Sequence, residues 1–381
     1  MSVNNATGGY VNTTRILLDY GANPNERKPN GWTALLVRHT SLDPCDAEYI
    51  LVVCDKQYGC KSGSEEVVRE LVNLGASTDV RNKEKATPLY IAARCVCCCK
   101  KFSMIAKEGH VNFFYREGSN EVVTFLVDHC NADPAAERTT NGRAPLHTAI
   151  SNTDPYVFDT LIQKTRCLAL PSIKDNSAHT LHHEAADVGS ISCCSVLEKF
   201  SFRFWTAGTN IAGQFPLQLA VLRMHEDFVA HVLQLLKEQN HSQSGVQVQL
   251  DQAVYDACTK GCSSILTMLL ENGANPNYCG KRRSALHAAS LGGTRDHIQC
   301  VETLLQHGAD PTFQDIDGLA ALESTQSLIH EYVSQTGTVR ATTANSQEHR
   351  FACLHKTVEV LERHMTRKER RDKPINQYNR D

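Results

Sequence analysis

A phrase of about nine residues recurs along the chain, and its repetition limits the folds that the chain can adopt. It reads LLDYGANPN at 17–25, LVNLGASTD at 71–79, LLENGANPN at 269–277 and LLQHGADPT at 304–312, with a weaker copy, LVDHCNADPA, at 126–135. An apolar stretch that runs into glycine is typical of a helix C-terminus, because glycine readily adopts the left-handed conformation that ends a helix. The sequence therefore predicts several short helices that end in the same way.

A second phrase follows these copies or stands alone. It reads ATPLYIAA from 86, APLHTA from 144, HTLHHEAA from 179, FPLQLA from 215 and SALHAA from 284, with distant forms from 32, 252 and 319. We measure the period at the position predicted to hold the first helical alanine, namely Arg38, Ala92, Ala149, Glu184, Ala220, Ala257, Ala289 and Thr325. Five of the seven intervals lie near 33 residues, and the first two exceed that period by roughly twenty.

These two phrases and their spacing resemble the ankyrin-repeat family, from about residue 8 to about residue 335. The resemblance implies an all-α repeat solenoid, in which each helix-turn-helix repeat carries a short β-turn or hairpin tip. It also implies that the histidine of the second phrase bonds to the backbone of adjoining turns, at His147, His182 and His287. Because no single repeat can bury its own apolar face, the repeats stack on one another. The stack would present a concave face and a row of turn tips, which is a geometry suited to binding.

The residues themselves fit this arrangement. Thr87 can cap a helix whose first residue is Pro88, since that position needs no N–H donor. Leu266, Leu269 and Leu270 follow helical spacing and supply an apolar stripe, and Gly273 then ends that helix. We therefore expect the second phrase to begin each repeat and the first phrase to close it.

The predicted organisation has five parts. We expect a disordered N-terminus at 1–10, a repeat array at 11–336, a linker at 337–347, a helix at 348–372 and a disordered tail at 373–381. Two insertions rich in apolar residues and cysteine, at 42–64 and 95–118, interrupt the array between the helices of a repeat, and we expect poor order in both. They are either binding loops or translated non-coding sequence. The array begins in mid-repeat, which predicts that the chain is a fragment of a longer protein.

The C-terminal helix is expected to be amphipathic. Its apolar stripe consists of Phe351, Leu354, Val358, Leu361 and Met365 at alternating spacings of three and four residues. The stripe either packs on the last repeat or docks a partner. The basic residues that follow it are typical of a solvated surface, with a nuclear localisation signal as the alternative.

Composition restricts the function classes. The 381 residues carry a net charge of −3, with 41% hydrophobic and 21% charged residues, which are ordinary values for a globular protein. This charge does not favour nucleic acid as a partner. No apolar window is long enough to cross a membrane. The 16 cysteines, without an apolar leader, indicate a reducing compartment, so we expect a cytoplasmic protein, with the nucleus as the alternative.

The sequence gives little support for an enzyme. Cys95, Cys97, Cys98 and Cys99 are too crowded for a good zinc site, even with help from Cys54 and Cys60. His183 and Glu184 begin a pattern similar to a metalloprotease helix, but the repeat phrase explains them more simply. We find no nucleotide-binding or nucleophile motif. The sequence therefore predicts no catalytic residue, no metal, no cofactor and no small-molecule substrate.

We predict a protein-interaction scaffold or adaptor that binds partner proteins through its concave face and turn tips. A regulatory fragment of a larger protein, whose functional domain lies outside this chain, is the alternative. The candidate binding residues are basic or aromatic and lie at the predicted tips: Arg27, Lys28, Trp32, Lys83, Lys85, Arg138, Arg143, Lys281, Arg282 and Arg283. They favour a partner with acidic segments. The family resemblance further implies hydroxylation of Asn25 and Asn277, each of which lies eight residues after a leucine.

Overall fold

The computed structural model of the chain describes residues 11–27, 29, 31, 33, 35, 65–94, 118–135, 139–151, 153, 155–165, 173–238, 244–280, 282–336 and 344–372. The predicted terminal segments 1–10 and 373–381 lie outside these residues, and so do both predicted insertions except for Gly118. The chain divides into two compact units, Met1–Gly213 (unit 1) and Gln214–Asp381 (unit 2), which are described separately.

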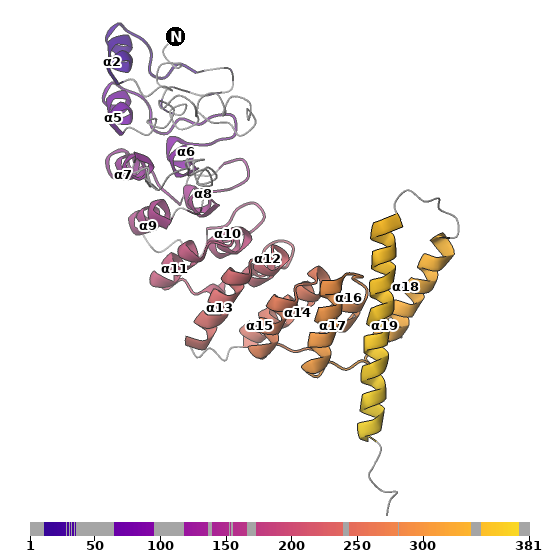
Figure 1. Cartoon of the computed structure of the whole chain (residues 1–381). Helices are drawn as coiled ribbons and strands as arrows, with labels where there is room; N and C mark the ends of the chain where they lie inside the picture. The colour runs from indigo at the N-terminus through magenta and orange to yellow at the C-terminus, as the bar shows by residue number, and fades with distance from the viewer. Residues whose placement is uncertain are drawn as a thin grey trace, which may run out of the picture. The chain divides into compact units, whose positions relative to one another are not determined.

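Unit 1 is built from short helices in two layers (Figure 1). The inner layer stacks α6 (Pro88–Arg94), α8 (Pro145–Ser151) and α10 (Leu181–Val188), and the outer layer stacks α2 (Val11–Asp19), α5 (Glu65–Asn73), α7 (Gly118–Cys130), α9 (Pro155–Lys164) and α11 (Ile191–Lys199). A short 3-10 helix, η4 (Phe204–Thr206), packs on α11. Within each repeat the inner helix also packs on the outer helix that follows it, so the core lies between the layers.

Unit 2 repeats this plan. The inner helices are α12 (Pro216–Leu222), α14 (Ser244–Lys260), α16 (Ala285–Ser290) and α18 (Ala321–Thr336). The outer helices are α13 (Glu226–Glu238), α15 (Ser263–Glu271), α17 (Arg295–Gln306) and α19 (Ala344–Asp372). Each inner helix packs on the next inner helix, and each outer helix on the next outer helix. The stacked plan confirms the prediction of an all-α repeat solenoid.

The C-terminal helix α19 takes the place of the outer helix in the last repeat, because it packs on both α17 and α18. It begins at Ala344, inside the segment predicted as a linker. Leu354 and Leu361 of the predicted stripe are fully buried, together with Thr357 between them. Packing on the last repeat, the first of the two alternatives, is therefore what the helix does.

Glycine follows several outer helices, among them α5, α15 and α17, as predicted. Gly75, Gly273 and Gly308 have φ values of 90°, 86° and 89°, which lie in the left-handed region. After Gly273, the N–H of Ala274 bonds to the carbonyl of Leu269, so the turn satisfies a helix-end carbonyl. Glycine thus recurs at this place in the sequence because the backbone of the turn needs a left-handed residue there.

The helix caps correct one assignment made from the sequence. In α8, the Nδ1 of His147 accepts from the N–H of Ala144, three residues earlier. In α10, Thr180 forms the same kind of cap with His183, not with His182. The position equivalent to His147 is therefore His183, and the first helical alanine is Ala185 where the sequence predicted Glu184. Two adjacent histidines made the register ambiguous by one residue.

Candidate functional site

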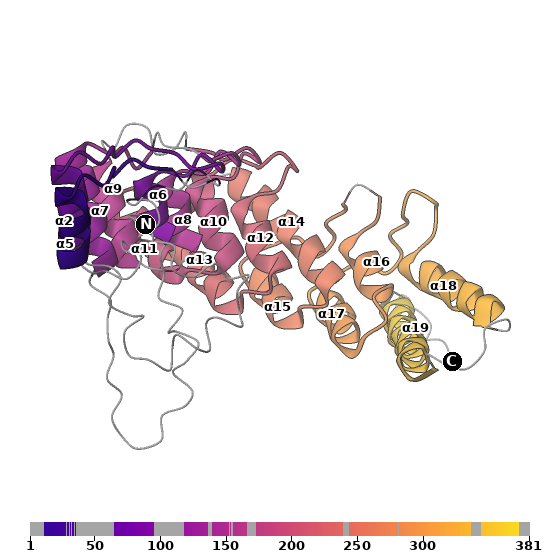
Figure 2. The same ribbon diagram turned by 90° about the horizontal axis from the view of Figure 1, so that it is seen from above.

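The tips that connect successive repeats form the candidate site. Each of five tip turns spans four residues and is closed by a hydrogen bond from the N–H of the fourth residue to the carbonyl of the first. Four of them lie in unit 1, at 82–85, 139–142, 175–178 and 210–213, and one lies in unit 2, at 315–318. A further hairpin in unit 2 is closed by an antiparallel bridge between Cys279 and Ser284. Figure 2 shows the loops before α16 and α18 standing out from the helices.

Asparagine or aspartate shapes three of these turns. The Oδ1 of Asn82 accepts from the N–H groups of residues 84 and 86, at 3.0 and 2.9 Å. Asp175 accepts in the same way from residues 177 and 179, at 2.8 Å each. Asp315 accepts from residues 317 and 319, at 2.9 and 3.1 Å. Such side chains hold their own backbone in a turn, so the tips are pre-formed.

Neighbouring tips are also bonded to one another by their backbones. In unit 1, Thr140 donates to the carbonyl of Glu84, Asn176 to that of Asn141 and Ile211 to that of Ser177, each at 3.0 Å. In each pair the second residue of one turn bonds to the third residue of the turn before it. We call this set of bonds the tip ladder. In unit 2, Ile316 makes the same contact with the carbonyl of Arg282, at 3.2 Å.

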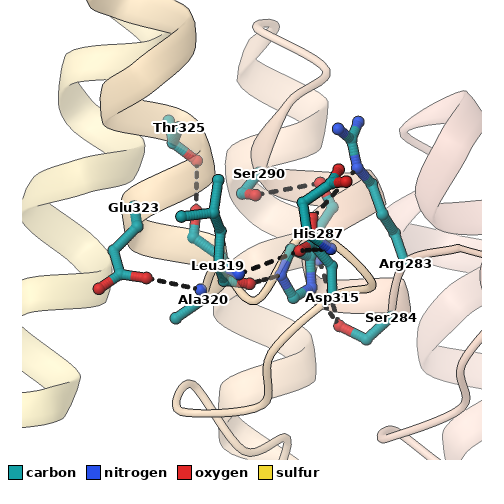
Figure 3. A network of polar contacts seen from close by, with 11 residues as sticks. Arg283, Ser284, His287, Ser290, Asp315, Leu319, Ala320, Glu323 and Thr325 are labelled. Atoms are coloured by element: carbon teal, nitrogen blue, oxygen red, sulfur yellow. Dashed lines mark hydrogen bonds and ion pairs between the residues drawn. The ribbon is translucent and has the colours of Figure 1, made fainter.

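A polar network anchors the last tip of unit 2 (Figure 3). The Asp315 carboxylate is fully buried, and the Nε of Arg283 lies 3.5 Å from its Oδ2. Burial would raise the pKa of Asp315, but the N–H groups of Leu319 and Asp317, with His287 and Arg283, more than offset this, so its pKa lies below the ordinary value. The Nε2 of His287 contacts the carbonyl of Leu319 at 3.0 Å and ties α16 to the tip.

The predicted binding residues separate into three groups. Lys28, Trp32, Arg138 and Lys281 lie outside the described residues. Arg27, Lys83, Lys85 and Arg282 are exposed, and Arg27 donates to the carbonyl of Arg81 at 3.2 Å. The remaining two, Arg143 and Arg283, form ion pairs with carboxylates of this chain. Since the exposed cations keep their charge available, they are the better candidates for partner contact.

Arg143 crosses from its tip to the next inner helix. Its Nη2 pairs with the Glu184 carboxylate on α10 and also contacts the hydroxyl of Ser151 on α8. The Glu184 side chain is 9% exposed and that of Arg143 is 28% exposed. The Nε of Arg143 is buried, and no described residue accepts a hydrogen bond from it. The contacts of Glu184 and His183 give both residues structural roles, in place of the metalloprotease role weighed from the sequence.

Sequence reasoning missed the exposed apolar residues at the tips. Ile211 and Ile316 occupy the same second position of their turns and are 74% and 60% exposed, while Phe313 is 39% exposed. Turn positions usually carry residues that shape the backbone, such as asparagine, glycine or serine. An exposed isoleucine neither shapes the turn nor packs in the core. Only the alignment of the turns, which the sequence does not show by itself, makes the two isoleucines equivalent.

The two asparagines predicted to be hydroxylated join successive repeats. The Asn25 side chain donates to the carbonyl of Gly75 and accepts from the N–H of Ser77, at 2.9 and 2.8 Å. Asn277 does the same with Gly308 and Asp310, at 3.4 and 2.7 Å. Hydroxylation at either residue stays a prediction.

The intermediate repeat of unit 2 replaces this asparagine with two residues of α14. Gln247 donates to the carbonyl of Gly273 at 3.0 Å, and Asp251 accepts from the N–H of Asn275 at 2.7 Å. The glycine and the residue two positions later are thus held as in the other repeats. This substitution explains how a repeat with a degenerate sequence still stacks.

His182 predicts a dependence of stability on pH. Burial lowers the pKa of His182 below its ordinary value of 6.5, and the hydrogen bond to the Phe202 carbonyl and the nearby Glu198 carboxylate offset this only in part. The His182 side chain therefore binds a proton more readily in the unfolded chain than in the folded chain. The stability that depends on a neutral His182 is fully present above pH 6.5 and is lost as the pH falls below that value. We expect the urea midpoint of the full chain to be lower at pH 5.5 than at pH 7.5.

A leucine at residue 182 provides the control, because Leu89, Leu146, Leu217 and Leu286 occupy the equivalent position. His182→Leu should remove part of the pH dependence, although it costs about 1 kcal/mol through the lost bond to Phe202. If the urea midpoints of His182→Leu at pH 5.5 and pH 7.5 differ as much as those of the original chain, groups other than His182 cause the pH dependence.

Several predicted absences concern only part of the chain. No group of three potential metal ligands occurs among the described residues, and the cysteine cluster at 95–99 lies outside them. Burial raises the pKa of Cys194 and Cys300 to about 12, so these thiols are poor nucleophiles. Within the described residues, no helix has the length and apolar character needed to cross a membrane.

Comparison with known proteins adds independent information. Residues 230–315 match the family model described as ankyrin repeats (3 copies). The chain is 32% identical over 118 residues to human BCL-6 corepressor-like protein 1 and 32% identical over 117 residues to the mouse protein. Each match covers 30% of this chain and 6% of the relative, so the chain spans a small part of the length of these relatives.

Solved structures of similar chains include two repeat domains. The ankyrin repeat domain of Bcl-3, described as a unique member of the IkappaB protein family, is 22% identical, with a TM-score of 0.46. That match covers 64% of this chain and 95% of the Bcl-3 chain. The human ASB11 ankyrin repeat domain is 17% identical, with a TM-score of 0.46, and the match covers 70% of this chain and 98% of the other.

Proposed function

We propose, from the premise that this chain is an ankyrin-repeat protein with an all-α solenoid fold, that it is an adaptor that holds partner proteins on its tips. The tip ladder carries the proposal, because it fixes exposed side chains in a row before any partner arrives. Binding to a pre-formed surface costs less conformational entropy than binding to a mobile loop. The surface therefore favours a binding role over catalysis.

Arg282 and Arg283 give a matched test of this adaptor. Arg282 is exposed, whereas Arg283 lies against the buried Asp315 carboxylate. Arg282→Glu should keep the fold and remove those partners that need a basic tip, as measured by proximity labelling in cells of origin. Arg283→Glu should instead destabilise unit 2, because it places a second carboxylate beside Asp315.

Arg295→Glu serves as a control for charge, since Arg295 is exposed at the start of the outer helix α17. A carboxylate is well tolerated at a helix N-terminus. If Arg282→Glu and Arg295→Glu give the same partners as the original chain, the basic tip has no part in binding. If the folded chain labels no protein above background, the adaptor proposal fails.

A second proposal is that the chain is the interaction region of a larger protein. It is supported by the coverage of only 6% of the two corepressor-like relatives. The name corepressor-like, which these relatives carry, also favours a nuclear location for this chain over a cytoplasmic one. An antibody against 344–372 should then detect a nuclear protein far larger than the 42.2 kDa chain. A single cytoplasmic band of the size of the chain would contradict both statements.

A further inference from the structure

The tips of unit 1 differ in chemistry along the ladder. The first tip is basic, since residues 81–85 hold Arg81, Lys83 and Lys85 against one carboxylate, Glu84. Lys83 and Lys85 are both exposed. The last tip is apolar, with Ile211 and Ala212 exposed. The row of tips therefore has two chemically distinct ends.

The exposed residues of the two tips between these ends are polar and uncharged. Thr140, Asn141, Asn176 and Ser177 are exposed there. The amide of Asn176 also donates to the carbonyl of Thr140 at 2.9 Å, so a side chain reinforces the ladder at this point. Exposed hydroxyl and amide groups in fixed positions can bond to the backbone of another chain.

The exposed Ile211 indicates that the apolar end is a contact surface. Its N–H is used in the ladder, but its side chain is 74% exposed. The same position is held by polar residues, Lys83, Thr140 and Asn176, in the other three turns of unit 1. Burying an isoleucine side chain against a partner is favourable, and the free chain does not gain this stabilisation.

We propose that this row, from Lys83 to Ala212, binds an extended segment of a partner protein that is acidic at one end and apolar at the other. The proposal rests on the adaptor function and names the partner for one part of its surface. Carboxylates would lie beside Lys83 and Lys85, and an apolar side chain would lie on Ile211. Adjacent helices pack about 8–10 Å apart, so three steps between tips span about 27 Å. An extended chain covers that length with about eight residues.

The test is selection of phage-displayed random twelve-residue peptides on the full chain. The selected peptides should carry acidic residues at one end and an apolar residue about eight positions away. Binding of the best peptide, made synthetically and labelled with fluorescein, is then measured by fluorescence anisotropy. We expect at least tenfold weaker binding to the double variant Lys83→Glu, Lys85→Glu and at least tenfold weaker binding to Ile211→Ser.

Ile316→Ser is the matched control, because Ile316 holds the same turn position in unit 2. It should leave binding unchanged, and a peptide with lysines in place of its acids should recover binding to the double variant. Circular dichroism and hydrogen exchange of each variant verify the fold. These readouts separate loss of a contact from loss of structure.

Four outcomes would overturn the proposal. The first is that no peptide is enriched, and the second is that the enriched peptides lack the two distinct ends. The third is that binding responds to Ile316→Ser or Arg282→Glu but not to the unit 1 variants, in which case the adaptor function stands and this row is not its site. The fourth is that single-stranded RNA displaces the labelled peptide and does so equally well from the original chain and from Ile211→Ser. That result would show that the surface binds by charge alone.

Discussion

Replacing Gly142 with alanine should lower the free energy of unfolding by about 2–4 kcal/mol. Gly142 ends its tip turn with a φ of 73°, and a Cβ there would lie 2.8 Å from the backbone nitrogen of Asn176. That nitrogen donates to Asn141 in the ladder, so moving it away would break a bond between tips. The loss is measured as the shift of the urea midpoint and as faster hydrogen exchange in α8 and α10.

Gly213→Ala is the matched control for this substitution. Gly213 has a φ of 75° at the same turn position, but a Cβ there meets nothing within 4 Å. Lys85 and Ala178 hold the position with φ values of 61° and 57°, so a side chain is tolerated where there is room. We expect a loss of about 1 kcal/mol from Gly213→Ala. Equal losses at both positions would show that conformational strain, not the contact with Asn176, decides the effect.

Much of the fold follows from local sequence. The recurring glycine predicts where outer helices end, and Thr180 or Ser284 together with a histidine three residues later marks where inner helices begin. Both signals act within a single turn of helix, so they survive in a single sequence. They explain why the repeat architecture was predictable although several repeats are degenerate.

The details that depend on contacts between repeats were not predictable. Nothing in the sequence of α14 indicates that Gln247 and Asp251 take over the bonds of the bridging asparagine. These residues lie about 25 positions before the turn that they hold. Arg143 and Arg283 looked like free basic residues for the same reason, since their acidic partners lie in the next repeat. Charge along a sequence does not reveal which charges are already paired.

The row of tips was predicted as a binding edge, but its character was not. The sequence drew attention to cations, whereas the ladder makes Ile211 and Ile316 equivalent. A lone exposed isoleucine carries little information, since much of any protein surface is apolar. Its position within an aligned set of turns supplies the information, and that alignment requires the hydrogen bonds.

The ion pair between Arg143 and Glu184 should be strongly coupled. Arg143→Met leaves the Glu184 carboxylate nearly buried beside the Ser151 hydroxyl and without its cation, so we expect a loss of about 2–3 kcal/mol of unfolding free energy. Glu184→Thr leaves Arg143 with Ser151 and partial solvent exposure, and should cost about 1 kcal/mol. Threonine is suitable because Thr148 occupies the equivalent position in α8.

The double variant Arg143→Met, Glu184→Thr should be more stable than Arg143→Met alone. Removing both charges abolishes the desolvation cost of the Glu184 carboxylate, which Arg143→Met alone leaves nearly buried without its cation. The double-mutant cycle, measured by urea unfolding, should therefore give a coupling energy of about 1.5–2 kcal/mol, above the loss from Glu184→Thr alone. Additive losses would mean that each side chain acts on its own, and that the pair does not join the two repeats.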